Sequence, residues 1–153
     1  MITAPIKRHK SLRPLSREHH DSLLLCWKIR RGLQKAVESG RIFDYVKYCA
    51  ARNLMPHFEV EEQVVFPVLG TRNELVREAL DQHARLRILF SRTETDAGTL
   101  SVLEQLLEKH IRFEERVLFQ EIQKAATPEQ MEAIEESHAG IAPEEEWADK
   151  FWE

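Results

Sequence analysis

The sequence predicts an all-α protein, an up-down-up-down four-helix bundle with a short C-terminal helix and a tail. Three observations favour this fold. Leu, Glu, Arg, Lys, Gln and Ala, which helices favour, dominate the central segments. Apolar residues recur at helical spacing in four long segments, and Val, Ile and Thr form no alternating runs. The chain of 153 residues contains only 5 glycines and suits one domain, residues 1–153, with one core.

The first two predicted helices are joined by a short connection. Ser16 is the expected N-cap of the first helix, and Ser39–Gly40 is its expected end. The apolar stripe of this helix consists of Leu23, Cys26, Ile29, Leu33 and Val37. The second helix is expected from about residue 43 to residue 68, with Pro56 inside it. Because proline removes a helical hydrogen bond, Pro56 should kink this helix.

The third and fourth predicted helices show the same apolar periodicity. The third runs from Glu74 to about residue 90, and the fourth from about residue 99 to residue 124. Asp96–Gly98 is the expected loop between them. Because the connections are short, consecutive helices should run antiparallel and form a bundle core over residues of about 11–124.

The C-terminal part, residues 127–153, is expected to form a short helix and a tail. Thr127–Gln130 has the form of an N-cap, a proline at the first helical position and a capping-box glutamine. This helix should end near Gly140. The tail from Pro143 is expected to wrap over the bundle, anchored by its aromatic residues Trp147, Phe151 and Trp152.

Composition and charge argue against several classes of function. The net charge is -4, and no basic cluster of roughly 5–8 residues occurs, so nucleic acid is not an expected partner. No run reaches about 18 apolar residues, so no membrane span is expected. The first five residues lack the apolar region of a signal peptide, which favours a cytosolic location. In a reducing cytosol, Cys26 and Cys49 are expected to be buried free thiols.

Two segments, residues 57–66 and residues 110–119, share the pattern His-x-x-x-Glu-Glu-x-Val-x-Phe. On an α-helix, residues i and i+4 share a face, so each segment places an imidazole beside a carboxylate. Glu61 of the first segment and Glu114 of the second both lie on the apolar stripe of their helix. A carboxylate in a helical core is costly unless it is paired or coordinates a metal. The repeated pattern therefore predicts a metal site inside the bundle.

The other two long helices each offer a histidine on the inner face. His83 lies between Leu80 and Leu86 on the third helix. On the first helix, the helical phase favours His19, whereas comparison with the third helix favours His20, and both remain candidates. The candidate ligands are therefore His19 or His20, His57, Glu61, His83, His110 and Glu114.

Four imidazoles and two carboxylates suit a pair of metal ions, because two carboxylates can bridge the ions and cancel most of their charge. Such ligands are typical of iron, manganese or zinc, and the availability of Fe(II) in the cell favours two iron ions. His9 and His138 lie outside the set and are expected at the surface, unless the tail brings His138 to the site. Glu62 and Glu115 are expected to face solvent or to contact the ligands from outside.

The combination His, His-x-x-x-Glu, His, His-x-x-x-Glu resembles the hemerythrin-like, or HHE cation-binding, family over roughly residues 9–122. The resemblance implies a left-handed up-down four-helix bundle with an oxo- or hydroxo-bridged di-iron centre. It also implies that the candidate residues are the iron ligands and that Glu61 and Glu114 bridge the irons.

Two departures from the family pattern argue against reversible oxygen storage. Oxygen-carrying hemerythrins have a second histidine one turn after that of the third helix, where this chain has Arg87. Arg87 should point to solvent or pair with a ligating carboxylate. Oxygen carriers also have His-x-x-x-x-Asp in the last helix, where this chain has His110 and Glu114.

Two hypotheses for function follow. The first is a di-iron module that binds or senses oxygen, nitric oxide, peroxide or iron. The second is a di-iron enzyme acting on peroxide or nitric oxide, which would need a substrate channel and a proton donor near the metals. A metal-free helical interaction module is disfavoured, because its core would hold uncompensated carboxylates.

Overall fold

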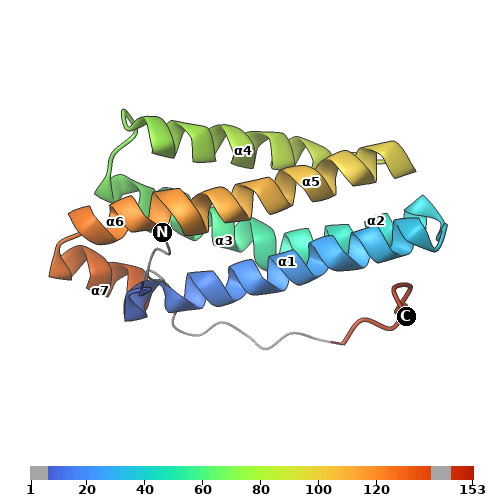
Figure 1. The fold of residues 1–153 in the computed structure, drawn as a ribbon, viewed down its shortest axis with the longest axis horizontal. Coiled ribbons are helices and arrows are strands. Elements are labelled where there is room, and N and C mark those ends of the chain that lie inside the picture. Colours follow the sequence, from blue (N-terminus) through green and yellow to red (C-terminus); the bar gives the residue numbers. More distant parts are fainter. Residues whose placement is uncertain (1–6, 139–145) are drawn as a thin grey trace, which may run out of the picture.

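A computed structural model describes residues 7–138 and 146–153 of the chain, and among these residues it contains helices and no strand (Figure 1). The all-α prediction is confirmed. The elements, in chain order, are η1 (Lys10–Leu12), α1 (Arg13–Gln34), α2 (Ser39–Cys49), η2 (Ala50–Leu54), α3 (Met55–Val60), η3 (Glu61–Val65), η4 (Phe66–Val68), α4 (Glu74–Phe90), α5 (Ala97–Phe113), η5 (Glu114–Leu118), α6 (Phe119–Ala125) and α7 (Pro128–Glu136).

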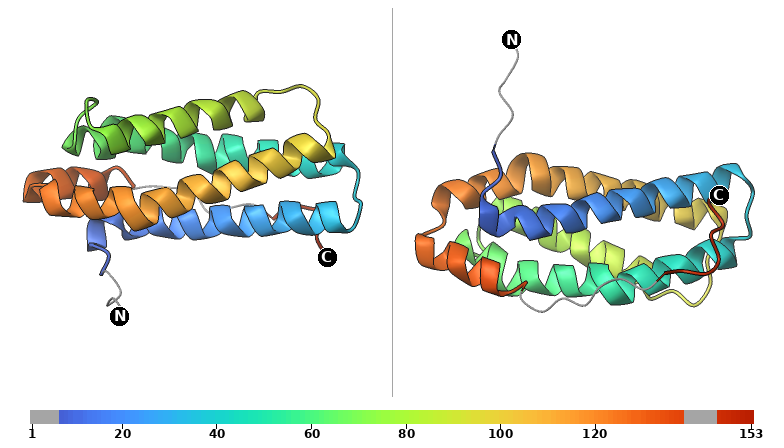
Figure 2. Two further views of the ribbon diagram at one scale, coloured as in Figure 1. Left: turned by 45° about the horizontal axis from the view of Figure 1, so that its top comes forward. Right: turned by 90° about the horizontal axis from the view of Figure 1, so that it is seen from below.

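Two of the long helical stretches continue through π-helical turns, in which the hydrogen bond spans five residues. The π turns η2 and η3 join α2, α3 and the 3-10 turn η4 into one stretch, and the π turn η5 joins α5 to α6. Figures 1 and 2 show both stretches lying lengthwise beside α1 and α4. α5 packs along both α1 and α4, and α1 also packs against α2.

The start of α1 differs from the prediction. α1 begins at Arg13, with Pro14 in its first turn, where the missing N–H of proline costs no hydrogen bond. Ser16 is therefore not the N-cap of this helix. Its hydroxyl instead donates a hydrogen bond to Oε2 of Glu115, at 3.1 Å. The sequence prediction erred because η1, which leads into α1, extends the helical stretch toward the N-terminus.

The end of α1 also comes earlier than predicted. The helix ends at Gln34, and Ala36 adopts a left-handed conformation with φ of 57°. Glycine usually takes this role at a helix end, so the glycine nearest in the sequence was a misleading signal. Ser39–Gly40 does not end α1 but opens α2.

The other helix boundaries lie close to the predictions. α4 spans Glu74–Phe90, as predicted. Of the predicted loop Asp96–Gly98, only Asp96 lies outside a helix, because its Oδ1 accepts a hydrogen bond from the Thr99 backbone N–H and α5 begins at Ala97. The helix also continues through Pro56, and the π turn η2 ends two residues before this proline.

The C-terminal helix begins with the predicted capping box of Thr127 and Gln130. α7 ends at Glu136, and Gly140, its predicted end, lies outside the described residues, as does Pro143. The described tail, residues 146–153, packs its aromatic side chains on α1 and α2. Phe151 is buried and fills the space over Gly32 that a side chain there would occupy.

The core has two apolar clusters with a polar layer between them. The first apolar cluster includes Leu25, Phe58, Leu86 and Leu107, and the second includes Leu15, Val65, Val76 and Leu118. On each long helical stretch, the chain passes from one cluster to the other through buried polar residues. This polar layer consists of His19, His57, Glu61, Gln82, His83, His110 and Glu114.

Two further observations bear on the predictions from composition. Cys26 and Cys49 are buried, and neither forms a disulfide bond, as predicted. Burial, followed by the charge of Glu104, raises the pKa of the Cys26 thiol to about 12, so this thiol is a poor source of thiolate. Within the described residues, no helix combines the length and the apolarity that crossing a lipid bilayer requires.

Candidate metal centre

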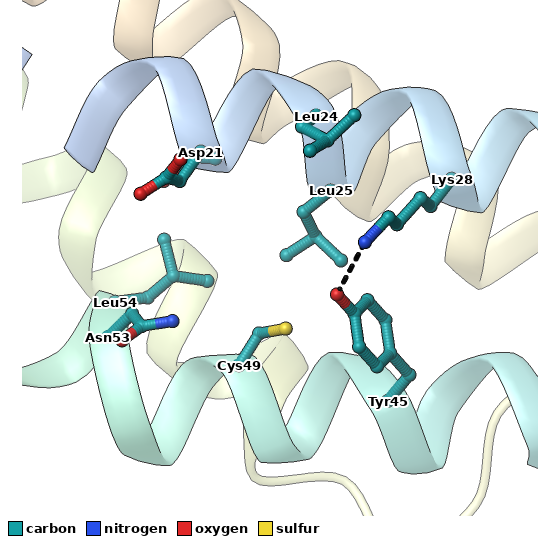
Figure 3. A pocket seen from close by; sticks show the side chains of 9 residues that line it. Asp21, Leu24, Leu25, Lys28, Tyr45, Cys49, Asn53 and Leu54 are labelled. Carbon is teal, nitrogen blue, oxygen red and sulfur yellow. Dashed lines mark hydrogen bonds between the residues drawn. The ribbon is translucent and has the colours of Figure 1, made fainter. Parts of the chain in front are cut away.

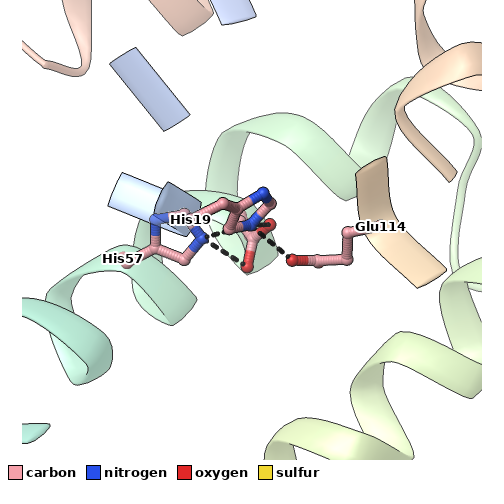
Figure 4. A group of neighbouring side chains, drawn as sticks. His19, His57 and Glu114 are labelled. Carbon is pink, nitrogen blue, oxygen red and sulfur yellow. Dashed lines mark hydrogen bonds and ion pairs between the residues drawn. The ribbon is translucent and has the colours of Figure 1, made fainter. Parts of the chain in front are cut away.

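The polar layer brings together six residues from the four long helical stretches. All six are buried, with exposed fractions between 0% and 5%. Figure 4 shows the rings of His19 and His57 turned toward the carboxylate of Glu114. The six residues are His19 on α1, His57 on α3, Glu61 at the start of η3, His83 on α4, His110 on α5 and Glu114 at the start of η5.

These residues form two adjacent groups that could hold a metal ion. Glu61 and Glu114 belong to both groups, and each group adds two histidines, His19 and His57 in one and His83 and His110 in the other. Within each group, the potential ligand atoms all lie within 4.8 Å of one another. The arrangement therefore has two imidazoles on each side of a shared pair of carboxylates.

In the first group, three side chains from α1, α3 and η3 meet Glu114. Nε2 of His19 lies 2.9 Å from Oε1 of Glu114 and 3.8 Å from Oε2 of Glu61. Nε2 of His57 lies 3.2 Å from Oε1 of Glu61 and 3.0 Å from Nε2 of His19. Both imidazoles thus direct the same ring nitrogen toward one point.

In the second group, the distances are similar. Nε2 of His83 lies 3.2 Å from Oε1 of Glu61 and 3.9 Å from Oε2 of Glu114. Nε2 of His110 lies 3.1 Å from Oε1 of Glu114. The i, i+4 pairs that the sequence predicted, His57 with Glu61 and His110 with Glu114, therefore converge from opposite sides on one centre.

Each of the four imidazoles faces an oxygen acceptor on its outer side. An Nδ1–H that donates outward leaves the Nε2 lone pair free to point inward, as in histidines that bind metals. Three Nδ1 contacts have hydrogen-bond lengths: His57 with Glu18 at 3.1 Å, His83 with Glu62 at 2.7 Å and His110 with Gln82 at 2.6 Å. Nδ1 of His19 lies 3.6 Å from Glu115, beyond hydrogen-bond distance.

Several buried atoms that face the centre have no hydrogen-bond partner in the described part of the chain. They are both carboxylate oxygens of Glu61, Oε2 of Glu114 and Nε2 of His83 and His110. Buried acceptors without a donor are costly, and facing lone pairs repel one another. A cation among these atoms would satisfy all of them at once, so the residues fit a metal.

The two central carboxyl groups have opposite pKa shifts. Burial, followed by the charge of Glu114, raises the pKa of the Glu61 carboxyl well above its usual range. Burial also acts to raise the pKa of Glu114, but His110 and His19 outweigh it and hold this pKa well below the usual range. In the absence of a cation, the two groups cannot both carry their charge without cost.

The carboxylates that follow Glu61 and Glu114 in the sequence lie outside the centre and are themselves held by arginines. Both guanidinium ends of Arg87 donate to Glu62, at 2.7 and 3.1 Å. Burial acts to raise the pKa of Glu62, but His83 and Arg87 outweigh it and lower the pKa to about 2. Arg8 lies 3.3 Å from Glu115 in the same way. Arg87 thus pairs with the carboxylate that orients His83, and not with Glu61 or Glu114.

Aromatic rings close the centre on its apolar sides. The ring of His83 stacks between Phe58, at 3.9 Å, and Phe66, at 5.5 Å. The ring of His19 stacks on Phe119 at 5.1 Å. Phe66 and Phe119 are the last residues of the two repeated segments. Each segment therefore supplies candidate ligand atoms and an aromatic ring that stacks on a histidine of the centre.

The remaining histidines are placed as follows. His20 is exposed and belongs to neither group, so the structure brings His19, and not His20, into the centre. His9 is exposed, as predicted, and its Nδ1 accepts the Ser11 backbone N–H at the start of η1. The surface prediction for His138 is wrong. Its side chain is only 5% exposed, and its Nε2 lies 3.1 Å from Oε1 of Glu18.

Sequence reasoning missed the residues that hold the imidazoles from outside, Glu18 and Gln82. Each directly precedes a histidine of the centre on the same helix. A polar residue next to an inward histidine was the available signal. The π turns were missed as well. Glu61 opens η3 and Glu114 opens η5, and π turns are frequent at functional sites.

Two of the pockets in the described part of the chain differ in how they relate to the centre. The smaller, of about 50 Å³, lies between α1 and the α2 stretch, where Lys28 donates to the Tyr45 hydroxyl (Figure 3). Its lining includes none of the six central residues. The other pocket, of about 170 Å³, borders the centre itself through His57, with Pro56, Val60 and His138 in its wall.

The geometry defines a buried histidine and glutamate cluster that could hold a metal ion. Comparisons of the chain with protein-family models, with curated proteins and with solved structures find no match.

Proposed function

We propose that this protein is a metal-binding protein of the hemerythrin-like kind, an up-down-up-down four-helix bundle that holds two iron ions in its polar layer. The observation that carries the proposal is the pair of buried groups that share Glu61 and Glu114. Two imidazoles on each side and two carboxylates between them suit two divalent ions of one kind. Manganese and zinc are the alternatives that this donor set allows.

Charge balance favours two ions over one. The shared carboxylates lie between the two pairs of imidazoles, where negative charge reduces the repulsion between two cations. A single ion beside His19 and His57 would leave the buried Nε2 atoms of His83 and His110 without a partner. The site therefore has donor atoms for a second ion.

The proposed role is to bind or sense a small ligand, such as oxygen, nitric oxide or peroxide, or iron itself. Iron, when bound, supplies redox chemistry toward such ligands. The chain's own residues orient the imidazoles through Glu18, Glu62 and Gln82, and aromatic rings stack on His19 and His83. Six protein ligands shared by two ions leave coordination positions for small molecules. Because Arg87 pairs with Glu62, it supplies no ligand that would fill one.

One observation favours the second candidate, a di-iron enzyme acting on peroxide or nitric oxide. The pocket of about 170 Å³ reaches His57 and has a size suited to a few water molecules or a peroxide. The imidazole of His138 and the carboxylate of Glu18 lie in its wall. A binding or sensing role needs no such groups, whereas an enzyme acting on peroxide does.

Metal analysis tests the proposal directly. Metal-free protein is reconstituted with Fe(II) under anaerobic conditions, and the iron content per chain is measured after desalting. We expect two ions per chain. One ion or none would contradict the two-metal proposal.

Exposure of the reduced, iron-loaded protein to air then distinguishes a binding or sensing role from an enzymatic role. We expect rapid oxidation to a stable diferric form, followed as near-UV and visible absorption. Repeated consumption of added peroxide would support the enzyme, and a single stoichiometric change would support the sensor. A long-lived oxygen adduct that releases dioxygen under vacuum would instead indicate an oxygen carrier.

A further inference from the structure

The C-terminal helix α7 is added to the four long helical stretches and touches the polar layer from outside. α7 packs on η1 and on η3, the π turn that begins with Glu61. Just beyond its end, His138 reaches α1 and lies beside Glu18. Two contacts therefore connect this helix to the elements that carry the candidate ligands.

The contact through His138 forms a chain of three side chains. Oε1 of Glu18 lies 3.1 Å from Nδ1 of His57 and 3.1 Å from Nε2 of His138. The same carboxylate oxygen thus serves both rings. The other ring nitrogen of His138 faces the carbonyl oxygen of Ile134 at 3.3 Å, which fixes the ring at the end of α7. The place of Glu18, and through it the orientation of His57, depends on a residue just beyond the end of α7.

His138 is also largely buried at this contact. Its side chain is 5% exposed, whereas that of Glu18 is 24% exposed. Both residues line the pocket of about 170 Å³ that borders His57. Loss of the His138 ring would enlarge this pocket and let water compete with His57 for the Glu18 carboxylate.

The other three imidazoles are held by residues outside α7. Arg87 holds Glu62, which faces His83. Glu78 accepts a hydrogen bond from Gln82, which faces His110, and Arg8 and Ser16 hold Glu115, which faces His19. An effect transmitted by His138 should therefore reach the ion beside His57 and not the ion between His83 and His110.

We propose that His138 is a positioning residue for the metal position of His19 and His57. It orients His57 through Glu18. Packing of α7 on the bundle should therefore strengthen binding of this one ion, and binding of the ion should stabilise the packing of α7. The inference rests on the proposed two-metal centre. It adds a partner for that centre from within the chain, the C-terminal helix.

The test is iron release from the full-length protein. Wild type and His138→Ala are loaded with Fe(II), their iron content is measured, and release to an excess of Fe(II) chelator is followed by absorbance under anaerobic conditions. Removing the outer partner of a ligand typically weakens metal binding by about 10–100-fold. We expect one of the two ions to leave His138→Ala about tenfold faster and the other to leave at the wild-type rate.

Three single variants and one double variant separate positioning from a general loss of stability. Glu132→Ala, an exposed position on the same helix, should release iron like wild type. His138→Gln should restore slow release, because its amide can donate to Glu18. Glu18→Ala should release one ion faster, and adding His138→Ala to it should have no further effect, because the two residues act in series.

The outcomes distinguish this inference from the proposed function. Wild-type protein that cannot hold two ions would refute the proposed centre and this inference with it. If wild type holds two ions, unchanged release in His138→Ala would overturn the inference alone. Faster release of both ions to the same extent, or additive effects of Glu18→Ala and His138→Ala, would also overturn it.

Discussion

Glu61 and Glu114 differ from the other candidate ligands because each belongs to both groups. If both bridge, Glu61→Ala removes a ligand from both ions at once. We therefore expect iron content after anaerobic reconstitution to fall from about two ions per chain to nearly none. Glu59→Ala, an exposed neighbour on the same helix, is the control and should keep both ions. A Glu61→Ala protein that retains one ion would show that this carboxylate serves only one position.

Glu62 should make the stability of the metal-free protein depend on pH. Its pKa is lowered from 4.5 to about 2, so it favours the folded state fully above about pH 4.5 and loses this effect as pH falls toward 2. Urea unfolding should thus show Glu62→Gln to be less stable than wild type at pH 6, with the difference shrinking toward zero near pH 2. Glu59→Gln should show no such trend, and a difference that is independent of pH would contradict the assignment.

Residue by residue, the sequence located most of the candidate centre, because His-x-x-x-Glu on a helix fixes a shared face. The sequence left His19 and His20 open, and the structure places His19, which the helical phase favoured, in the centre. Comparison with the third helix misled because Leu23 is only half-buried, whereas Leu86 is fully buried, so the two leucines are not equivalent. His138 could not be placed from sequence, because its burial depends on the contact between α7 and α1.

At the scale of elements, α7 should respond to metal binding. Coupling between two sites is reciprocal, so a helix that helps to retain an ion is itself stabilised by that ion. Hydrogen exchange followed by mass spectrometry should show slower exchange of α7 backbone amides in the iron-loaded protein than in the metal-free protein. In His138→Ala this difference should shrink. Equal exchange of α7 in wild type with and without iron would argue against the coupling.

Element boundaries were predictable where local side chains set them. Thr127 caps α7 with its own oxygen atom, and this capping signal was read in the sequence. Asp96 caps α5 in the same way but was assigned to the loop before the helix. The turn at Ala36 and the π turns at Glu61 and Glu114 were not readable. An α turn and a π turn differ by one residue in the hydrogen bond, and contacts across the core decide between them.

At the scale of the whole molecule, the tail provides a test of packing far from the polar layer. A Cβ atom on Gly32 would lie 2.9 Å from the ring of Phe151 and from Ile42, so Gly32→Ala must displace one of them. Overpacking of this kind costs roughly 1–3 kcal/mol. We expect chemical denaturation to show lower stability than in the control Gly40→Ala, which has open space around it, and iron content to stay at two. Unchanged stability would mean that the tail is not packed there.

The separation of the core into two apolar clusters has a consequence for the release and rebinding of metal at the candidate centre. None of the six candidate ligands belongs to either cluster, and the clusters lie on both sides of the polar layer. Each can hold its ends of the helices together by itself. Loss of the ions should therefore destabilise only the polar layer between the two clusters. Zinc fingers, in contrast, unfold when their metal is removed. A protein built this way can report whether its metal is present while it remains folded.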